Sequence, residues 1–237
     1  MPQTIAARIE ADIEAQILSG TWPPGSRLPY EHVMMEQYRC SRMTVSKVLT
    51  GMSARGLIVR RRRAGSFVAI PNADRAVLQI EDFAQQALHS GQSYRHAIHH
   101  RSLRALRRGE LTALGLATSG QVLEVHCRHE LDGIPVAWEE RLILVDAVPA
   151  IIDEMFLSIP PGTWLLQHVP WNKAEHVISA VNASPQQARQ LSIEEGAACL
   201  ELHRRTWLLG SLVTDVSLTY PGSRYRFSGC FSPGGPA

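Results

Sequence analysis

The chain has 237 residues, 45% of them hydrophobic and 19% charged, a composition typical of a globular protein large enough for two domains. No apolar run approaches the ~18 residues of a membrane span. The N-terminus lacks the basic and apolar blocks of a secretory signal, so we expect neither a membrane nor a secreted protein. The four cysteines stand apart without C-x-x-C spacing, which argues against a disulfide scaffold and fits a cytoplasmic protein.

The net charge of +2 is unevenly distributed along the chain. Residues 1–70 contain 10 Lys and Arg against 5 Asp and Glu, whereas the remainder contains 14 against 17. A basic segment followed by a mildly acidic one indicates a domain that meets a polyanion and a second domain with another task. We therefore expect a head at 1–70, a linker at 71–75 and a second domain at 76–237.

The head begins with three predicted helices. Isoleucines recur every four residues from Ile5 to Ile17, and Gly20 ends this first helix. A second, short helix is expected from about Pro29, with Val33 and Met34 facing inward. Ser41 is placed to cap a third helix, whose buried stripe has helical spacing: Val45, Val48, Leu49 and Met52.

A basic hairpin follows the third helix. Two short apolar runs, 57–59 and 66–69, flank four consecutive arginines at 60–63. Alone, the arginine run is equally consistent with a solvated loop, and Ser41 with an ordinary capped helix. Together, in this order and spacing, they predict a winged helix-turn-helix, in which a helix enters the major groove and an arginine-tipped wing reaches phosphates or the minor groove.

Three segments of the head resemble the DNA-binding domain of GntR-type bacterial regulators: residues 18–29 (LSGTWPPGSRLP), 41–45 (SRMTV) and 65–68 (GSFV). Two positions depart from the family pattern. Tyr30 stands where the family usually has a serine that caps the second helix, and Ala64 replaces the first glycine of the wing. The resemblance implies that double-stranded operator DNA is the partner, and that it is contacted by Arg27, His32, Ser41, Arg42, Thr44, Ser46, Lys47, Arg63 and Gly65.

The second domain is predicted to be α+β, with an antiparallel sheet. A helix is expected over 76–90, with Val77, Ile80, Phe83, Ala84 and Leu88 inward and Gly91 as its end. Asp132-Gly133 predicts a hairpin turn between strands at 121–131 and 134–145. Further strands are expected at 174–182, 197–208 and 212–219, the last two joined at Gly210-Ser211, with helices near 146–156 and 185–192.

Enzyme and metal motifs are missing from this domain. Neither G-x-S-x-G nor H-E-x-x-H occurs, so we expect no catalytic residues and no cofactor. His96, His99 and His100 are close in sequence, but neighbouring residues of a strand point to opposite faces, so we expect no metal site. Several segments instead carry the mixed charges that could orient a small polar anion, although for any one residue a surface ion pair is the commoner explanation.

The second domain resembles the UTRA domain of the HutC subfamily, a fold shared with chorismate lyase. The resemblance rests on residues 132–135 (DGIP), 139–141 (EER), 204–207 (RRTW) and 221–226 (PGSRYR). It implies a ligand-responsive repressor, a homodimer, that controls histidine-degradation genes and is induced by urocanate, an imidazole acrylate. Sugar-phosphate-sensing relatives often have Arg-x-Arg before the hairpin, whereas here Glu130 takes the second position and would repel a phosphate.

The expected ligand site contains His129, Glu140, Arg141, His176, Arg205 and Tyr225. In it, Arg141 would bind the ligand carboxylate, while Glu140 and Tyr225 would bind the imidazole. Three alternatives remain open: the same architecture with another small acid or a sugar phosphate as effector, an enzyme of the chorismate lyase fold with a DNA-binding head, and a general nucleic-acid-coating protein. The small net charge disfavours the last of these.

Overall fold

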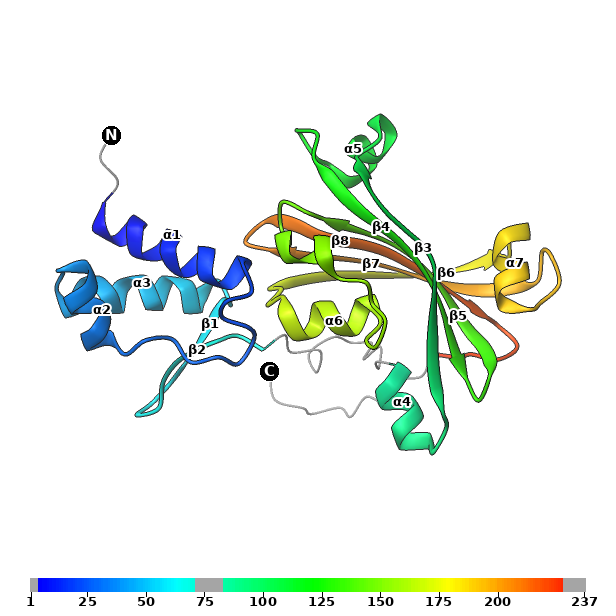
Figure 1. The fold of residues 1–237 in the computed structure, drawn as a ribbon, viewed down its shortest axis with the longest axis horizontal. Coiled ribbons are helices and arrows are strands. Elements are labelled where there is room, and N and C mark those ends of the chain that lie inside the picture. The colour runs from blue at the N-terminus through cyan, green and yellow to red at the C-terminus, as the bar shows by residue number, and fades with distance from the viewer. Residues whose placement is uncertain (1–3, 71–82, 228–237) are drawn as a thin grey trace, which may run out of the picture.

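The structure, a computed structural model, describes residues 4–70 and 83–227, here called the head and the C-terminal domain. The linker expected at 71–75 and the beginning of the helix expected at 76–90 lie outside these ranges. The head is a winged helix-turn-helix (Figure 1). Its elements are α1 (Ile5–Leu18), α2 (Glu31–Tyr38), α3 (Arg42–Ala54), β1 (Ile58–Arg61) and β2 (Gly65–Val68).

The core of the head follows the predicted helical stripes. Ile9, Ile13 and Ile17 of α1 are buried, whereas Ile5 in the first turn is 48% exposed. All four predicted residues of α3 are buried, and the Ser41 hydroxyl accepts a hydrogen bond from the Thr44 amide at 3.2 Å, which confirms Ser41 as the cap. Leaving aside Ile5, the helical periodicity therefore identified the core faces of α1 and α3.

Helix α2 begins without a side-chain cap. Tyr30 occupies the capping position and makes no capping hydrogen bond. Its ring lies instead under the Arg27 guanidinium, 4.0 Å from the ring centroid. The prediction that Val33 faces inward is wrong, because Val33 is 40% exposed and Met34 alone of the helix is buried.

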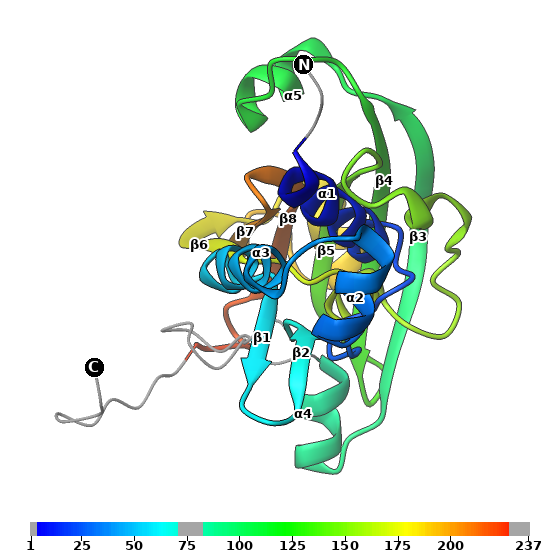
Figure 2. The same ribbon diagram turned by 90° about the vertical axis from the view of Figure 1, so that its left-hand side faces the viewer.

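The C-terminal domain is built on one six-stranded antiparallel sheet in the order β3-β4-β5-β8-β7-β6. Figures 1 and 2 show the sheet strongly twisted, and in Figure 1 α6 lies beside it on the side of the head. The strands are β3 (Tyr94–Ala105), β4 (Gln121–Leu131), β5 (Ile134–Leu144), β6 (Lys173–Asn182), β7 (Ala198–Leu208) and β8 (Ser211–Pro221). The helices are α4 (Phe83–Ser90), α5 (Arg108–Leu114), η2 (Pro149–Asp153, a 3-10 helix), α6 (Pro161–His168) and α7 (Pro185–Leu191).

Two hairpins of the sheet turn on left-handed residue pairs. Asp132 and Gly133 have φ of 50° and 76°, the geometry of the predicted turn. The Asp132 carboxylate also accepts the Ser93 amide at 2.8 Å, which ties the turn to β3. The second turn is formed by Leu209 and Gly210, one residue earlier than predicted.

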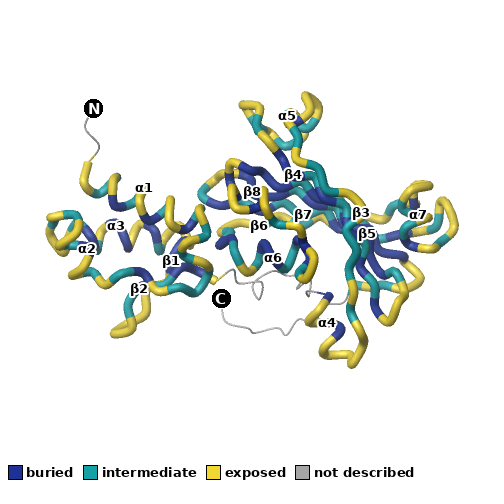
Figure 3. Tube along the Cα trace, viewed as in Figure 1, coloured by how far each residue is buried: buried dark blue, intermediate teal, exposed yellow. Residues whose placement is uncertain are grey.

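The helices of this domain were predicted less well than its strands. In α4, Phe83 and Ala87 are buried, whereas Ala84 and Leu88 are exposed, so the predicted inward face is wrong for those two. Helix α6 was not predicted, yet it covers the sheet with buried Trp164 and Leu165. The dark blue centre of the sheet in Figure 3 shows where the core lies.

One arginine near the end of the domain ties three segments together. Arg224 donates to the carbonyls of Pro135 at 3.0 Å, Leu191 at 2.8 Å and Ser192 at 3.0 Å. The last two carbonyls lie at the C-terminal end of α7, where helix carbonyls have no intrahelical partner. This explains in physical terms the arginine of the 221–226 motif. No helix in the described part of the chain is long and apolar enough to cross a membrane.

Candidate functional site

The outward face of α3 presents polar and basic side chains at the edge of the head. The Arg42 side chain is 80% exposed, and Lys47 is also exposed. Thr44 is half-buried and its hydroxyl lies 3.0 Å from that of Ser41, so both belong to the helix cap. Ser41 and Thr44 therefore set the position of the helix start, while the exposed side chains of Arg42 and Lys47 extend outward.

Arg60, which the sequence reasoning did not select, connects the wing to both helices. Its guanidinium donates to Thr50 Oγ1 at 2.7 Å and to Ser46 Oγ at 3.4 Å, both on α3. It also pairs with Glu31 of α2 at 2.7 Å. Arg42 pairs with the same carboxylate at 3.3 Å. Glu31 therefore orients two arginines, one from the wing and one from α3.

Arg27 supports the tip of the wing. It donates to the Ala64 carbonyl at 2.6 Å. Gly65 has φ of 105°, and a Cβ added there would lie 3.3 Å from the Arg27 guanidinium. The positive φ therefore favours glycine at 65, and a Cβ there would also crowd the Arg27 side chain. Arg63, at the tip, is exposed and has φ of 65°.

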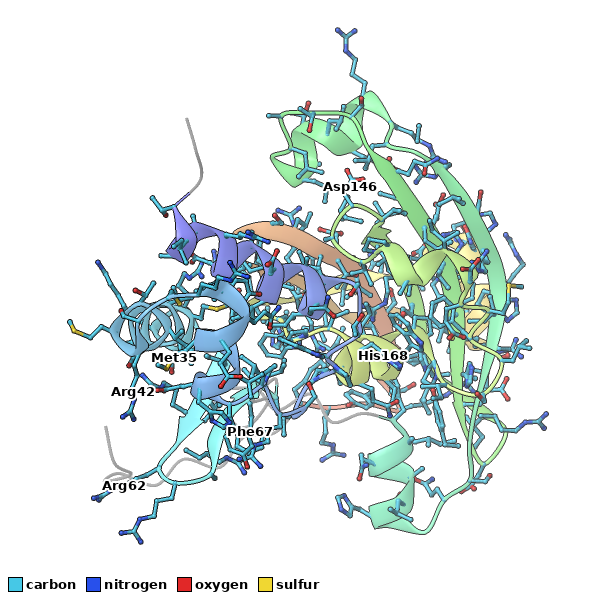
Figure 4. The ribbon with its side chains drawn as sticks, turned by 60° about the vertical axis from the view of Figure 1, so that its left-hand side comes forward. Met35, Arg42, Arg62, Phe67, Asp146 and His168 are labelled. Atoms are coloured by element: carbon cyan, nitrogen blue, oxygen red, sulfur yellow. The ribbon has the colours of Figure 1, made fainter. Side chains whose placement is uncertain are left out.

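Helix α3, helix α2 and the wing enclose a basic groove of about 510 Å³. Figure 4 shows Arg42 from α3 and Arg62 from the wing on the same outer side of the head. An arginine-lined concavity beside a helix start can accept the phosphates and base edges of duplex DNA. Of the predicted DNA-contacting residues, this groove is lined by His32, Arg42, Arg63 and Gly65.

The C-terminal domain contains a second site, a cavity of about 80 Å³ between the sheet and α6. This volume exceeds the roughly 10–15 Å³ that one water needs. Phe83 of α4 lines one side, where its ring stacks on that of His129 at 4.4 Å. The polar or charged residues in the lining are His129, Glu139, Arg141, Thr163, Arg204, Thr206, Thr214 and Tyr220.

Strand register places two arginines on the same face of the sheet. Arg141 of β5 pairs with Val216 of β8, which pairs with Arg204 of β7, which pairs with His176 of the edge strand β6. Paired residues of neighbouring strands point to the same face, so this row extends under α6. His176 lies beside Arg204 but outside the cavity lining. Burial and the Arg204 charge lower the pKa of His176 to about 4.

Glu139 is the anion of this face, and its interactions are fully made within the protein. Arg141 Nε donates to Glu139 Oε1 at 2.6 Å, and His129 Nε2 lies 3.2 Å from Oε2. Burial raises the pKa of Glu139, but Arg141 and His129 outweigh burial and hold this pKa well below its usual range. Tyr94 Oη lies 2.8 Å from His129 Nδ1, so both ring nitrogens of His129 have hydrogen-bond partners.

Arg204 has no such partner among the described residues. Its Nε is buried without a hydrogen bond, and no described carboxylate forms an ion pair with it. Burial and the Arg141 charge lower the pKa of Arg204, although a guanidinium stays protonated in proteins. The buried Tyr220 hydroxyl also lacks a hydrogen bond. With two guanidiniums against one carboxylate, the cavity has a net positive charge and free donors, the properties of a site for a small anion.

Strand alternation separates the predicted ligand residues into two groups. His129 and Arg141 line the cavity. Glu140 and Arg205 lie on the opposite face, where Arg205 binds Asp215 at 2.6 Å, so the structure does not bring these two residues to the cavity. Tyr225 stacks on Tyr220 at 4.3 Å, outside the lining.

Two charged residues that the sequence reasoning did not select line the cavity instead. Glu139 and Arg204 precede Glu140 and Arg205 and have the parity of the cavity face. A signal for this was present in the sequence, because Glu139 and Arg141 are two residues apart and must share a face of a strand. Among the residues that the structure describes, no three His, Cys, Asp or Glu could together hold a metal ion.

Comparison with known proteins agrees with both halves of this architecture. Residues 5–68 match the gntR family of bacterial regulatory proteins, and residues 89–226 match the UTRA domain. The chain belongs to the GntR family of regulators that have a UTRA domain. It is a transcriptional repressor related to the histidine utilization repressors, as predicted from the sequence.

The relatives match over nearly their whole length. The histidine utilization repressor of Pseudomonas putida is 32% identical over 98% of this chain and 93% of its own, and that of Klebsiella aerogenes is 28% identical over 97% and 95%. Among solved structures, the C-terminal domain of the histidine utilization repressor from Pseudomonas syringae aligns with a TM-score of 0.56 at 28% identity, covering 60% of this chain and all of that one. PhnF from Mycobacterium smegmatis shares the fold, with a TM-score of 0.58 at 17% identity over 97% of this chain and 99% of its own.

The two cavity arginines should differ in their effect on stability. Arg141→Met leaves Glu139 buried without its main partner, so we expect a loss of about 3–5 kcal/mol. Arg204→Met removes an unpaired buried charge and should be neutral or stabilising. Urea unfolding without any added ligand measures both. If the two variants lose the same stability, Arg204 is paired in solution and the net charge assigned to the cavity is wrong.

Proposed function

We propose that this repressor binds operator DNA through its head and releases it when a small carboxylate, urocanate, binds the cavity of the C-terminal domain. The observation that supports the ligand class is the buried Arg204, whose Nε has no hydrogen bond and which forms no ion pair with a carboxylate of the described residues. We also propose the boundaries 1–70 for the head, 71–75 for the linker and 76–237 for the ligand-binding domain. The similarity to histidine utilization repressors supports histidine-utilization genes as the target.

The chemistry of the cavity fits a planar acid with a polar ring. The ligand carboxylate would accept hydrogen bonds from the Arg204 guanidinium and from the Tyr220 hydroxyl, because Arg204 Nε and Tyr220 Oη have no hydrogen-bond partner within the protein. Arg141, which the sequence reasoning assigned to the carboxylate, is already bound to Glu139 and would act by holding that residue in place. The imidazole ring would lie among Phe83 and the buried Thr206. A phosphate dianion would face the Glu139 carboxylate, which disfavours a sugar phosphate.

The groove of the head would contact DNA through a subset of the predicted residues. We propose Arg42 and the wing arginines, Arg63 among them, for direct contact, because they are exposed and line the groove, and Lys47, because it is exposed on the same helix as Arg42. His32 is exposed in the same groove and stacks on Tyr30. The remaining predicted residues support this surface without direct DNA contact. Arg27 holds the Ala64 carbonyl, Ser46 accepts from Arg60, Ser41 and Thr44 form the helix cap, and Gly65 allows the wing to turn.

Arg42→Ala tests this assignment of the reading helix. Loss of a bidentate contact to guanine costs about 1–3 kcal/mol, so affinity for an operator selected from random duplex DNA should fall roughly 5–150-fold. Titration at fixed salt measures it. Arg189→Ala, the same charge change at an exposed site on α7, is the matched control and should leave the affinity unchanged. Unchanged affinity in Arg42→Ala would remove α3 from the interface.

We propose a two-fold dimer as the functional unit. One helix and one wing read only a few base pairs, which is too little to select an operator within a genome. Two heads on a near-palindrome double the contacts, and the symmetry of the site mirrors that of the dimer. Light scattering at micromolar concentration should give about twice the chain mass, and a monomer that still binds its selected operator tightly would contradict the proposal.

Urocanate binding is tested by calorimetry with two neighbouring arginine variants. The wild type should release or absorb heat with urocanate, and Arg204→Met should not, because its carboxylate anchor is gone. Arg205→Met makes the same change on the other face of β7 and should bind like the wild type. No heat with urocanate up to millimolar concentration would reject this ligand. Binding by Arg204→Met would show that the anchor is misassigned.

A further inference from the structure

Asn172 bridges the C-terminal domain and the end of the reading helix. Its side-chain Nδ2 donates to the carbonyl of Arg55 at 2.9 Å. Its Oδ1 accepts the Leu209 amide at 3.2 Å, and its own amide donates to the Trp207 carbonyl at 3.0 Å. Both polar atoms of this side chain are therefore in use, one toward each domain. Between described residues of the two domains, the structure shows no other side-chain hydrogen bond and no ion pair.

The acceptor of this bond is firmly placed within the head. Arg55 is the residue at the C-terminal end of α3, where a backbone carbonyl has no helical partner of its own. Its guanidinium pairs with Glu14 of α1 at 3.1 Å and also with Glu10. Gly56, with φ of 76°, lets the chain turn here, and its position leaves the Asn172 Cβ 3.6 Å from where a Cβ of residue 56 would be. A displacement of Asn172 would therefore act on the Arg55 carbonyl, at the C-terminal end of α3.

The residue before Asn172 belongs to the cavity. Trp171 lines it, as do Gly162, Leu165 and Leu166 of α6. The segment from the end of α6 to the start of β6 is only four residues long, 169–172. A ligand that displaces the Trp171 ring therefore acts one peptide bond away from the hydrogen bond to the reading helix. In Figure 1 the end of α3 lies close to the start of β6, at the edge of the sheet.

We infer that Asn172 is the positioning residue that couples the cavity to the reading helix, and that ligand binding breaks its bond to Arg55. This inference rests on the proposed function for the identity of the ligand, but not for the existence of the bond. With the bond intact, α3 has one orientation relative to the C-terminal domain. With the bond broken, the head is released from that orientation, and two heads of a dimer no longer match adjacent half-sites. Differential affinity of the ligand for these two states is what coupling requires.

Asn172→Asp breaks the bond with the smallest possible change. An aspartate has the same shape and still accepts the Leu209 amide, but it places an oxygen where Asn172 donates to Arg55. Without urocanate, this variant should bind the selected operator about 5–150-fold more weakly than the wild type, as the wild type does when saturated with urocanate. Adding urocanate should weaken it less than about twofold further, although calorimetry shows the ligand still bound. Asn172→Ala should behave in the same way.

Asn182→Asp is the matched control, because it makes the same change at the exposed far end of β6. It should keep both the operator affinity and the full response to urocanate. Wild-type affinity and a wild-type response in Asn172→Asp would overturn the inference.

Hydrogen exchange of residues 53–58 without ligand tests the bond independently of urocanate. Exchange there should be faster in Asn172→Asp than in the wild type, and equal exchange would overturn the inference. If the wild type ignores urocanate while Asn172→Asp shows faster exchange and weaker operator binding, the ligand assignment fails and the role of Asn172 is retained.

Discussion

The ion pair between Glu139 and Arg141 is the interaction on which the cavity depends. Both side chains are almost fully buried, and removing two such charges from water costs several kcal/mol for each ion before they attract one another. Their geometry offsets this cost, because His129 contacts the second carboxylate oxygen of Glu139 and Arg141 Nη1 donates a further hydrogen bond to Thr214 Oγ1 at 3.3 Å. Glu139 and Arg141 therefore satisfy one another within the protein, and Arg204 is left to interact with a ligand.

Arg204, beside the Glu139–Arg141 pair, is a destabilising residue of the fold. A buried guanidinium beside a second guanidinium is unfavourable, and a sheet selected for stability alone would place an apolar residue there. Perturbed charges of this kind concentrate at functional sites, where a ligand completes what the fold leaves unsatisfied. The apolar remainder of the lining, which includes Phe83, Trp171 and Leu218, keeps the dielectric low and makes the attraction for an anion stronger than it would be at the surface.

The head uses a carboxylate in the opposite way. Glu31 is partly exposed and holds Arg60 and Arg42 at the edge of an open groove, where solvent screens the ion pairs and makes each of them weak. Weak pairs fit the proposed role of this groove, in which the arginines exchange Glu31 for DNA phosphates. Glutamate and arginine thus form a buried, stable ion pair inside the C-terminal domain and weak, exposed ion pairs on the head.

The sequence by itself determined the order of elements in the head, its core stripes, the Asp132-Gly133 hairpin and the family. These features depend on local chemistry, such as the period of the apolar residues, the Ser41 cap and turn residues with positive φ, and local chemistry is readable along the chain. Five of the six strands of the sheet were predicted closely for the same reason, whereas β3 was not among the predicted strands and the eight-residue α6 was not predicted either.

Only the tertiary structure decided which polar residues share the cavity. The distinction between Glu139 and Glu140, or between Arg204 and Arg205, depends on which strand face is covered by α6, and a shift of one residue reverses every side chain. The pairing of Asn172 with Arg55 and of Arg60 with Glu31 joins residues 117 and 29 positions apart. No local pattern specifies such contacts, because they arise only when separate elements pack together.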